Sequence, residues 1–182
     1  GLTRLTSGRI ILDGKVVGKD MEIPDNIGAI IETPGFIKSF SGYDNLKYLA
    51  SVRKMIGKEE IVSAMEKAGL DPAMKKHVGK YSLGMRQRLG IAQAIMEKPD
   101  ILILDEPTAV LTPQETEKLF AVLKNMKKHG KSIIIITHKL NEVMAISDRV
   151  AILRKGEYIG VVETSETDPD QLTEMMVGRP IS

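Results

Sequence analysis

A run of four branched apolar residues, 101–104, ends abruptly in two carboxylates, Asp105 and Glu106. Pro99 and Pro107 bound this run on its two sides. A segment so short and so apolar is typical of a strand that is buried on both faces of a parallel sheet. In an open α/β sheet, ligands bind at the carboxyl ends of such strands. The pattern therefore predicts that both carboxylates reach a ligand-binding edge, although a solvated turn after a structural strand would produce the same pattern.

Two further apolar runs predict neighbouring strands of the same sheet. Residues 27–31 end in Glu32, and residues 132–137, with four consecutive isoleucines, predict a second fully buried strand that ends in His138. Because parallel strands present their carboxyl ends at one edge, we expect Glu32 and His138 to lie on the edge that carries Asp105. A solvated loop acid and a helix-terminal polar residue without a ligand are the alternative interpretations of these two positions.

The periodicity changes to that of helices between about residues 41 and 97, where apolar residues recur every three or four positions. This block indicates a helical subdomain inserted into an α/β core formed by residues 1–40 and 98–182. Ser82 is expected to cap the third helix of the block, and Gly84 leaves room for a ligand to approach its first turn. Exposed amides at that turn could bind an anion, but serine and glycine at a helix start are usually a simple cap.

Turn and capping signals complete the predicted element order. Asp13-Gly14 and Lys155-Gly156 each separate two strand-like runs and predict hairpins. Thr112, followed by a proline and by Glu115, predicts a helix with a capping box, and Asp168-Pro169 predicts the start of a last helix. Strands alternating with helices indicate an α/β fold with a mostly parallel sheet.

Composition narrows the possible functions of this 182-residue chain. There is no cysteine, which excludes disulfides and thiolate metal sites, and the three histidines lack metal-ligand spacing. A formal net charge of +2 gives no electrostatic case for a nucleic-acid partner. No apolar run approaches the length that spans a bilayer. The length is sufficient for one domain with a substantial core.

The order of these landmarks resembles the nucleotide-binding domain of ATP-binding cassette (ABC) transporters. Residues 81–111 carry the most specific match, because they resemble the family's signature sequence running into its Walker B strand. The resemblance extends over residues 1–182, which would form a single domain. It implies a P-loop NTPase-like (RecA-like) fold and the binding and hydrolysis of ATP with Mg²⁺.

The resemblance also implies roles at the sheet edge. Asp105 corresponds to the Walker B aspartate, a Mg²⁺ ligand that acts through water. Glu106 resembles the catalytic glutamate that polarises the attacking water, and His138 matches the switch histidine that contacts the γ-phosphate. Glu32 falls where the family usually has glutamine, in a loop that senses Mg²⁺ and the transmembrane partner.

Two positions outside that edge are implied to bind nucleotide across a dimer. Ser82 and Gly84 match the signature loop, which in this family closes over ATP held by the opposite subunit. The match is incomplete, since the usual Leu-Ser-Gly-Gly-Gln is replaced by Tyr-Ser-Leu-Gly-Met at 81–85. Thr112 also stands where the family's D-loop has aspartate, which puts communication between subunits in doubt.

As a family member, the chain would be the ATP-hydrolysing subunit of a transporter. Its implied partners are a transmembrane permease and a second nucleotide-binding domain, identical or different, at the cytoplasmic face of the membrane as a peripheral protein. Residues 27–36 resemble exporters of the bacitracin and lantibiotic group, whereas residues 104–115 and 173–179 resemble sugar and nucleoside importers. Cargo and direction therefore stay open. A soluble ABC-type ATPase, or a non-catalytic half-site that completes a partner's ATP pocket, are the alternatives.

One family motif is missing from the sequence. No Gly-x-x-x-x-Gly-Lys-Ser/Thr segment, which cradles nucleotide phosphates, occurs in the 182 residues. The triplet at 130–132 lacks the first glycine, since Asn125 stands there, and it precedes a strand instead of a helix. We expect a chain truncated before or within the P-loop helix, which alone binds ATP poorly and hydrolyses none.

Overall fold

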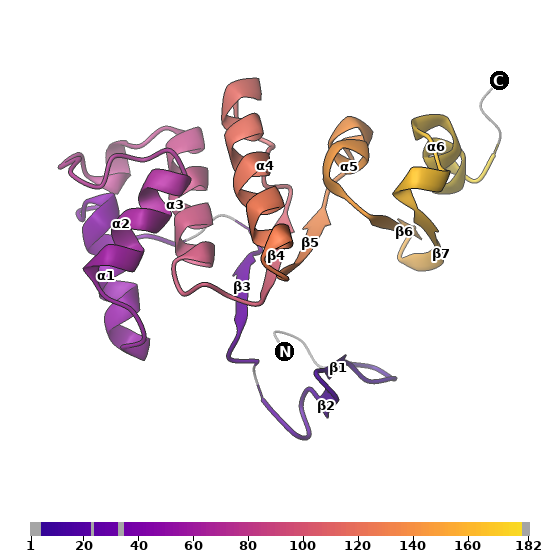
Figure 1. Cartoon of the computed structure of the whole chain (residues 1–182), viewed down its shortest axis with the longest axis horizontal. Coiled ribbons are helices and arrows are strands. Elements are labelled where there is room, and N and C mark those ends of the chain that lie inside the picture. Colours follow the sequence, from indigo (N-terminus) through magenta and orange to yellow (C-terminus); the bar gives the residue numbers. More distant parts are fainter. Residues whose placement is uncertain (1–4, 23, 33–34, 180–182) are drawn as a thin grey trace.

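Three parallel strands form the centre of the molecule (Figure 1). The structure, a computed structural model, describes residues 5–22, 24–32 and 35–179. Three parts of the predicted domain lie outside the described residues: its two ends at 1–4 and 180–182, and residues 33–34 of the loop expected after Glu32. The strands are β3 (Ile27–Ile30), β4 (Ile101–Asp105) and β5 (Ser132–Ile136), in the order β3-β4-β5. The predicted parallel arrangement is confirmed, because both pairs run parallel.

The prediction that residues 132–137 form a strand buried on both faces is wrong for the described residues. Leu102 and Leu104 of β4 are fully buried, but Ile134 and Ile136 of β5 are 52% and 54% exposed. β5 pairs on one side only, with β4, and the described part of the chain provides no other strand along its second edge. Because successive side chains point to opposite faces of a strand, the exposed alternate isoleucines lie on a face of β5 that the described elements leave uncovered.

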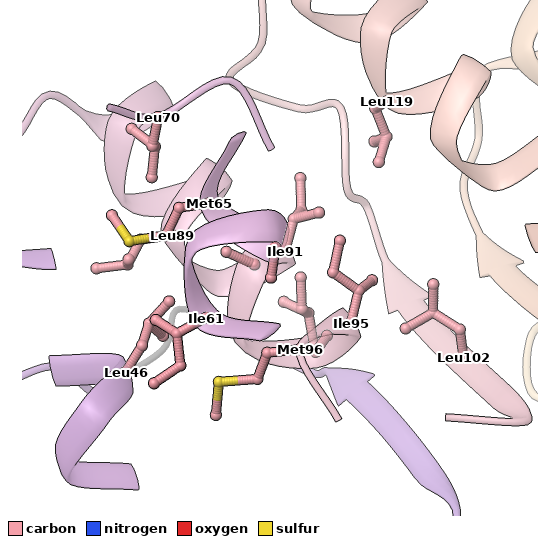
Figure 2. Packing of buried hydrophobic residues seen from close by; sticks show 14 of the residues in the cluster. Leu46, Ile61, Met65, Leu70, Leu89, Ile91, Ile95, Met96, Leu102 and Leu119 are labelled. Atoms are coloured by element: carbon pink, nitrogen blue, oxygen red, sulfur yellow. The ribbon is translucent and has the colours of Figure 1, made fainter. Parts of the chain in front are cut away.

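The block between the first two strands is helical, as predicted. It contains α1 (Gly42–Arg53), α2 (Lys58–Lys67), the 3-10 turn η1 (Val78–Lys80) and α3 (Leu83–Ile95). These helices gather on one side of the central sheet (Figure 1). Figure 2 shows their apolar side chains converging with those of β4 on one core, in which Leu46, Met65 and Leu89 are fully or almost fully buried. Burial of each such side chain contributes about 1.5–3 kcal/mol.

Helix α4 (Pro113–Lys128) follows β4 and places its Leu119 and Leu123 in the same core. The expected capping box is present: Thr112 Oγ1 accepts from the Glu115 amide at 3.2 Å, and Glu115 Oε2 accepts from the Thr112 amide at 2.9 Å. A short helix, α5 (Leu140–Ile146), follows β5. The loops that begin these two helices hold the residues of interest.

Two hairpins confirm the turn predictions. The turn at Asp13-Gly14, with φ of 47° and 77°, joins β1 (Ile11–Leu12) to β2 (Lys15–Val16). β6 (Arg149–Arg154) pairs with β7 (Glu157–Glu163), which leads through η2 (Thr164–Glu166) into α6 (Pro169–Val177), capped by Asp168 as expected. Among the described helices, none combines the length and apolar character needed to cross a bilayer.

Candidate functional site

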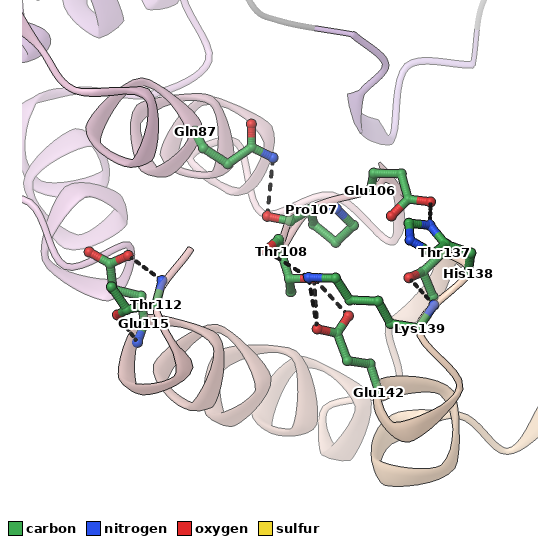
Figure 3. A network of polar contacts seen from close by, with 10 residues as sticks. All are labelled: Gln87, Glu106, Pro107, Thr108, Thr112, Glu115, Thr137, His138, Lys139 and Glu142. Atoms are coloured by element: carbon green, nitrogen blue, oxygen red, sulfur yellow. Dashed lines mark hydrogen bonds and ion pairs between the residues drawn. The ribbon is translucent and has the colours of Figure 1, made fainter. Parts of the chain in front are cut away.

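Glu106 and His138 meet at the carboxyl edge of the sheet. Asp105 is the last residue of β4 and lies opposite Ile136, the last residue of β5. The Glu106 amide continues this pairing by donating to the Ile136 carbonyl at 2.8 Å. The chain then turns so that His138 Nδ1 lies 2.7 Å from Glu106 Oε1 (Figure 3). The parallel strands thus bring side chains 32 residues apart into direct contact.

The polarity of this contact follows from the two groups. An ionised carboxylate only accepts hydrogen bonds, so a hydrogen bond to the Glu106 carboxylate requires the proton on Nδ1 of His138. Nε2 is then the ring nitrogen left to face solvent or a ligand, and the His138 side chain is 74% exposed. The second carboxylate oxygen of Glu106, Oε2, is buried without a hydrogen-bond partner in the described residues. A buried oxygen of this kind is costly unless a ligand or water satisfies it.

Glu106 is also strained in its backbone. Its φ of +43° lies in the left-handed region, which non-glycine residues seldom adopt. Such a conformation costs of order 1 kcal/mol or more and persists only where neighbours enforce it. Two neighbouring features hold the Glu106 backbone in this conformation. One is the fully buried Pro107, and the other is the hydrogen bond that the Glu106 amide donates to the Ile136 carbonyl.

Asp105 is suited to a hard cation but does not form a complete site alone. Its carboxylate has no hydrogen-bond or ion-pair partner in the described residues, so its oxygens are available. Oxygen ligands suit Mg²⁺, which keeps several waters and is often bound through one or two carboxylates plus substrate phosphates. No cluster of three or more acidic, histidine or cysteine residues suited to a metal occurs in the described part of the chain. The donor set therefore fits Mg²⁺ carried in with a phosphorylated ligand.

Glu32 follows the neighbouring strand at the same edge. Ile30 of β3 lies opposite Leu104 of β4, so Glu32 lies two residues past the carboxyl end of β3. It is exposed, has a φ of +69°, and contacts neither Glu106 nor His138. The structure therefore places Glu32 on the expected edge, although outside the contacting pair.

Ser82 and Gly84 lie elsewhere, at the start of α3. Ser82 Oγ accepts from the Met85 amide at 3.1 Å and so acts as the expected helix cap. A Cβ at Gly84 would lie 3.2 Å from the Val110 carbonyl oxygen, so this first turn packs against the loop that follows Glu106. Neither residue contacts the Glu106–His138 pair in the described residues.

A second polar group, not predicted from the sequence, lies beside the first. Thr108 is 1% exposed, and its hydroxyl lies 2.8 and 2.7 Å from the two carboxylate oxygens of Glu142. Lys139 Nζ donates to the Thr108 carbonyl at 3.1 Å and lies 3.2 Å from its hydroxyl (Figure 3). The sequence gives only a weak indication of this group, namely that Lys139 directly follows His138 and that Glu142 lies about one helical turn after Lys139.

Comparison with known proteins identifies the family of the chain. A family model described as ABC transporter matches residues 1–109. The uncharacterized ABC transporter ATP-binding protein YhcH of Bacillus subtilis is 38% identical over 94% of the chain and 57% of its own length. Nucleoside import ATP-binding protein NupA of Lactococcus lactis is 35% identical over the whole chain and 38% of its own length. Bacitracin transport ATP-binding protein BcrA of Enterococcus faecalis is 40% identical over 77% of the chain and 46% of its length.

Solved structures support the same fold. The dimeric structure of a bacterial ABC transporter cassette superposes with a TM-score of 0.77 at 22% identity, over 90% of this chain and 76% of that one. This likeness confirms the P-loop NTPase-like α/β fold. The chain itself spans little more than half the length of the first two curated relatives, 57% and 58%. The family match covers more than half of the sequence, and the chain belongs to the ABC transporter family.

Proposed function

We propose that this chain provides the ATP-hydrolysing edge of a subunit that powers an ABC transporter. The observation that carries the proposal is the contact between Glu106 and His138, at 2.7 Å, directly beside an unpartnered Asp105. Phosphoryl transfer to water uses groups that hold the metal, position the water and contact the phosphate, and Asp105, Glu106 and His138 offer one candidate for each of these roles. Their convergence from β4 and β5 supports this function over a structural role.

Each residue has a distinct part in the proposal. Asp105 would hold Mg²⁺, directly or through water, and the bound ion would neutralise charge on the transferred phosphate. Glu106 would orient and polarise the attacking water through its carboxylate. His138 would face the γ-phosphate through Nε2; to donate a hydrogen bond there while Nδ1 donates to Glu106, it must be an imidazolium.

The remaining site residues are proposed to act between subunits. Ser82 and Gly84 would close over ATP held by a second nucleotide-binding domain, because they lie at a helix start away from the Glu106–His138 pair. Glu32, exposed beyond β3, would sense Mg²⁺ and a transmembrane permease. The protein would then be peripheral at the cytoplasmic face of the membrane. Since the relatives named above include a nucleoside importer and a bacitracin transporter, we propose no cargo.

The 182 residues themselves are proposed to be inactive in isolation, because they contain no glycine-rich cradle or P-loop lysine for the phosphates. Purified chain should bind Mg²⁺–ATP weakly and show no turnover above background. Joining a Gly-x-x-x-x-Gly-Lys-Thr strand–loop–helix segment of the family to its N-terminus should restore turnover. The proposed inactivity would be refuted if the unjoined chain hydrolysed ATP and Asp105→Asn abolished that hydrolysis. The hydrolytic role would be refuted if the joined chain bound ATP but showed no turnover.

A further inference from the structure

The loops after β4 and β5 are joined at two places, and only one of them is the Glu106–His138 contact. The other is the group formed by Thr108, Lys139 and Glu142, which we call the loop clamp (Figure 3). Thr108 lies two residues after Glu106, and Lys139 lies one residue after His138. The clamp therefore joins the two loops within one or two residues of each member of the contacting pair.

The residues of the loop clamp are largely buried, and their polar groups form hydrogen bonds with one another. Thr108 is almost fully buried, and the side chains of Glu142 and Lys139 are 15% and 37% exposed. The Thr108 hydroxyl donates to Glu142, while its carbonyl and hydroxyl oxygens accept from Lys139. Lys139 Nζ also lies 3.6 Å from Glu142 Oε1, an ion pair within the first turn of α5. Each group thus depends on the other two. Such a hydrogen-bond network can contribute more stability than the sum of its separate pairs.

His138 has no comparable support of its own. Its side chain is 74% exposed, and its one polar contact in the described residues is with Glu106. The contact of an exposed imidazole with a carboxylate on another loop is kept only while the two backbones stay at the right separation. Lys139 holds that backbone twice, through its side chain to Thr108 and through its amide, which donates to Thr137 Oγ1 at 3.1 Å.

We propose that Thr108, Lys139 and Glu142 are positioning residues that set the orientation of His138 toward Glu106. They do not touch the reacting groups themselves; they hold the two loops in register so that Nδ1 of His138 donates to Glu106 and Nε2 faces the ligand side. The inference rests on the proposed function only in taking Glu106 and His138 as the working pair.

The tautomer of His138 measures this orientation directly. In a neutral imidazole without constraints, the Nε2–H form is the more common one, whereas donation to Glu106 requires Nδ1–H. Long-range ¹H–¹⁵N NMR of the chain, at a pH where the imidazole is neutral, distinguishes the two forms. The chain has three histidines, and a His138→Gln spectrum identifies the signal. The experiment needs no ATP, so its outcome is independent of whether the chain takes part in hydrolysis.

Four variants separate positioning from general stability. Thr108→Val and Lys139→Met should convert His138 from mainly Nδ1–H to mainly Nε2–H, with a dispersed amide spectrum retained. Thr108→Ser, which keeps the hydroxyl, should preserve the Nδ1–H form. Lys127→Met is the matched control, because it breaks a surface ion pair with Asp148, at 2.9 Å, outside the clamp.

Three results would overturn the proposal. It fails if folded Thr108→Val and Lys139→Met both keep the Nδ1–H tautomer of the unaltered chain. It fails equally if Lys127→Met abolishes that tautomer, because the effect would then not be specific to the clamp. It also fails if His138 is mainly Nε2–H in the unaltered chain.

Discussion

Glu106 combines three features that a merely structural residue would not need. Its backbone is in the left-handed region at φ +43°, one carboxylate oxygen is buried without a partner, and the other accepts from His138. Each of these costs stability or limits the choice of residue at this position. Their coincidence at the carboxyl end of a buried strand is typical of a site built for chemistry.

At the same scale, Tyr81 provides a test of the helical core by pH. Burial raises the pKa of the Tyr81 phenol. Because the folded-state pKa lies above the ordinary value of 10.0, the unfolded chain loses its phenol proton first as pH rises. Stability is therefore unaffected by this group below about pH 10 and falls above it.

We expect Tyr81→Phe to reduce the loss of unfolding free energy between about pH 9 and pH 11, measured by urea unfolding. The Tyr81 hydroxyl has no hydrogen-bond partner in the described residues, so the variant should differ by less than about 1 kcal/mol at neutral pH. Tyr158→Phe, at a residue that is 64% exposed, is the control and should leave the alkaline loss unchanged. An identical alkaline loss in both variants would contradict the account of Tyr81.

Side chains directly after apolar strands could be predicted from sequence, and clamp residues could not. Asp105 and His138 follow runs whose hydropathy alone indicates parallel strands, so their shared edge follows from topology. Thr108 and Glu142 are 34 residues apart, and no periodicity relates them. Their contact depends on how the β4–α4 loop packs against α5, which a local pattern does not encode.

At the scale of elements, the close packing of β3 against α3 decides whether the helical block stays on the sheet. Gly28 of β3 leaves no room for a side chain: a Cβ there would overlap the Ala94 carbonyl oxygen and lie 2.9 Å from Pro99 Cγ. The backbones of β3 and α3 are therefore in close contact at Gly28 and Ala94. The sequence offered the glycine but no indication of which backbone it faces.

Gly28→Ala should accordingly lower the free energy of unfolding by roughly 1–3 kcal/mol, because backbone must shift to accept the methyl group. Gly35→Ala is the matched control, since nothing lies within 4 Å of its added Cβ, and it should change stability by about 0.5 kcal/mol or less. Chemical denaturation of both variants measures the difference. Equal stability of the two would show that β3 and α3 are not packed as described.

A single arginine links α3 to α4 and to the end of α2. Arg88 Nη2 lies 3.2 Å from Glu115 Oε1, Nη1 donates to the Gly69 carbonyl at 2.7 Å, and Nε donates to the Gly84 carbonyl at 3.3 Å. The Arg88 and Glu115 side chains are only 21% and 23% exposed, so solvent screens the pair less than a surface one. The start of α3 and the capping box of α4 are held together by this group.

We predict that Arg88→Met destabilises the chain by roughly 1–3 kcal/mol, since it leaves a half-buried carboxylate and two carbonyls without their donor. Arg86→Met, which removes only a 3.4 Å contact with the Gly79 carbonyl, should cost clearly less. Thermal unfolding by circular dichroism compares them. A larger loss from Arg86→Met would contradict the assigned role of Arg88.

At the scale of the whole molecule, the fold class was predictable and the accessibility of the sheet was not. Alternating strand and helix patterns correctly predicted an α/β fold with a parallel sheet, and capping signals placed α4 and α6. The exposure of Ile134 and Ile136 contradicts the fully buried strand expected from their hydropathy. Burial depends on which elements lie beside β5, and the isoleucines themselves carry no information about that.

The central claim is that Glu106 polarises the water that attacks ATP, and one rate comparison tests it most directly. In the chain joined to a family P-loop segment, Glu106→Gln should lower kcat for ATP at least about 100-fold while ATP binding is retained. Glu117→Gln, an exposed position on α4, should leave kcat unchanged. Hydrolysis by Glu106→Gln at the rate of the unaltered joined chain would contradict the account.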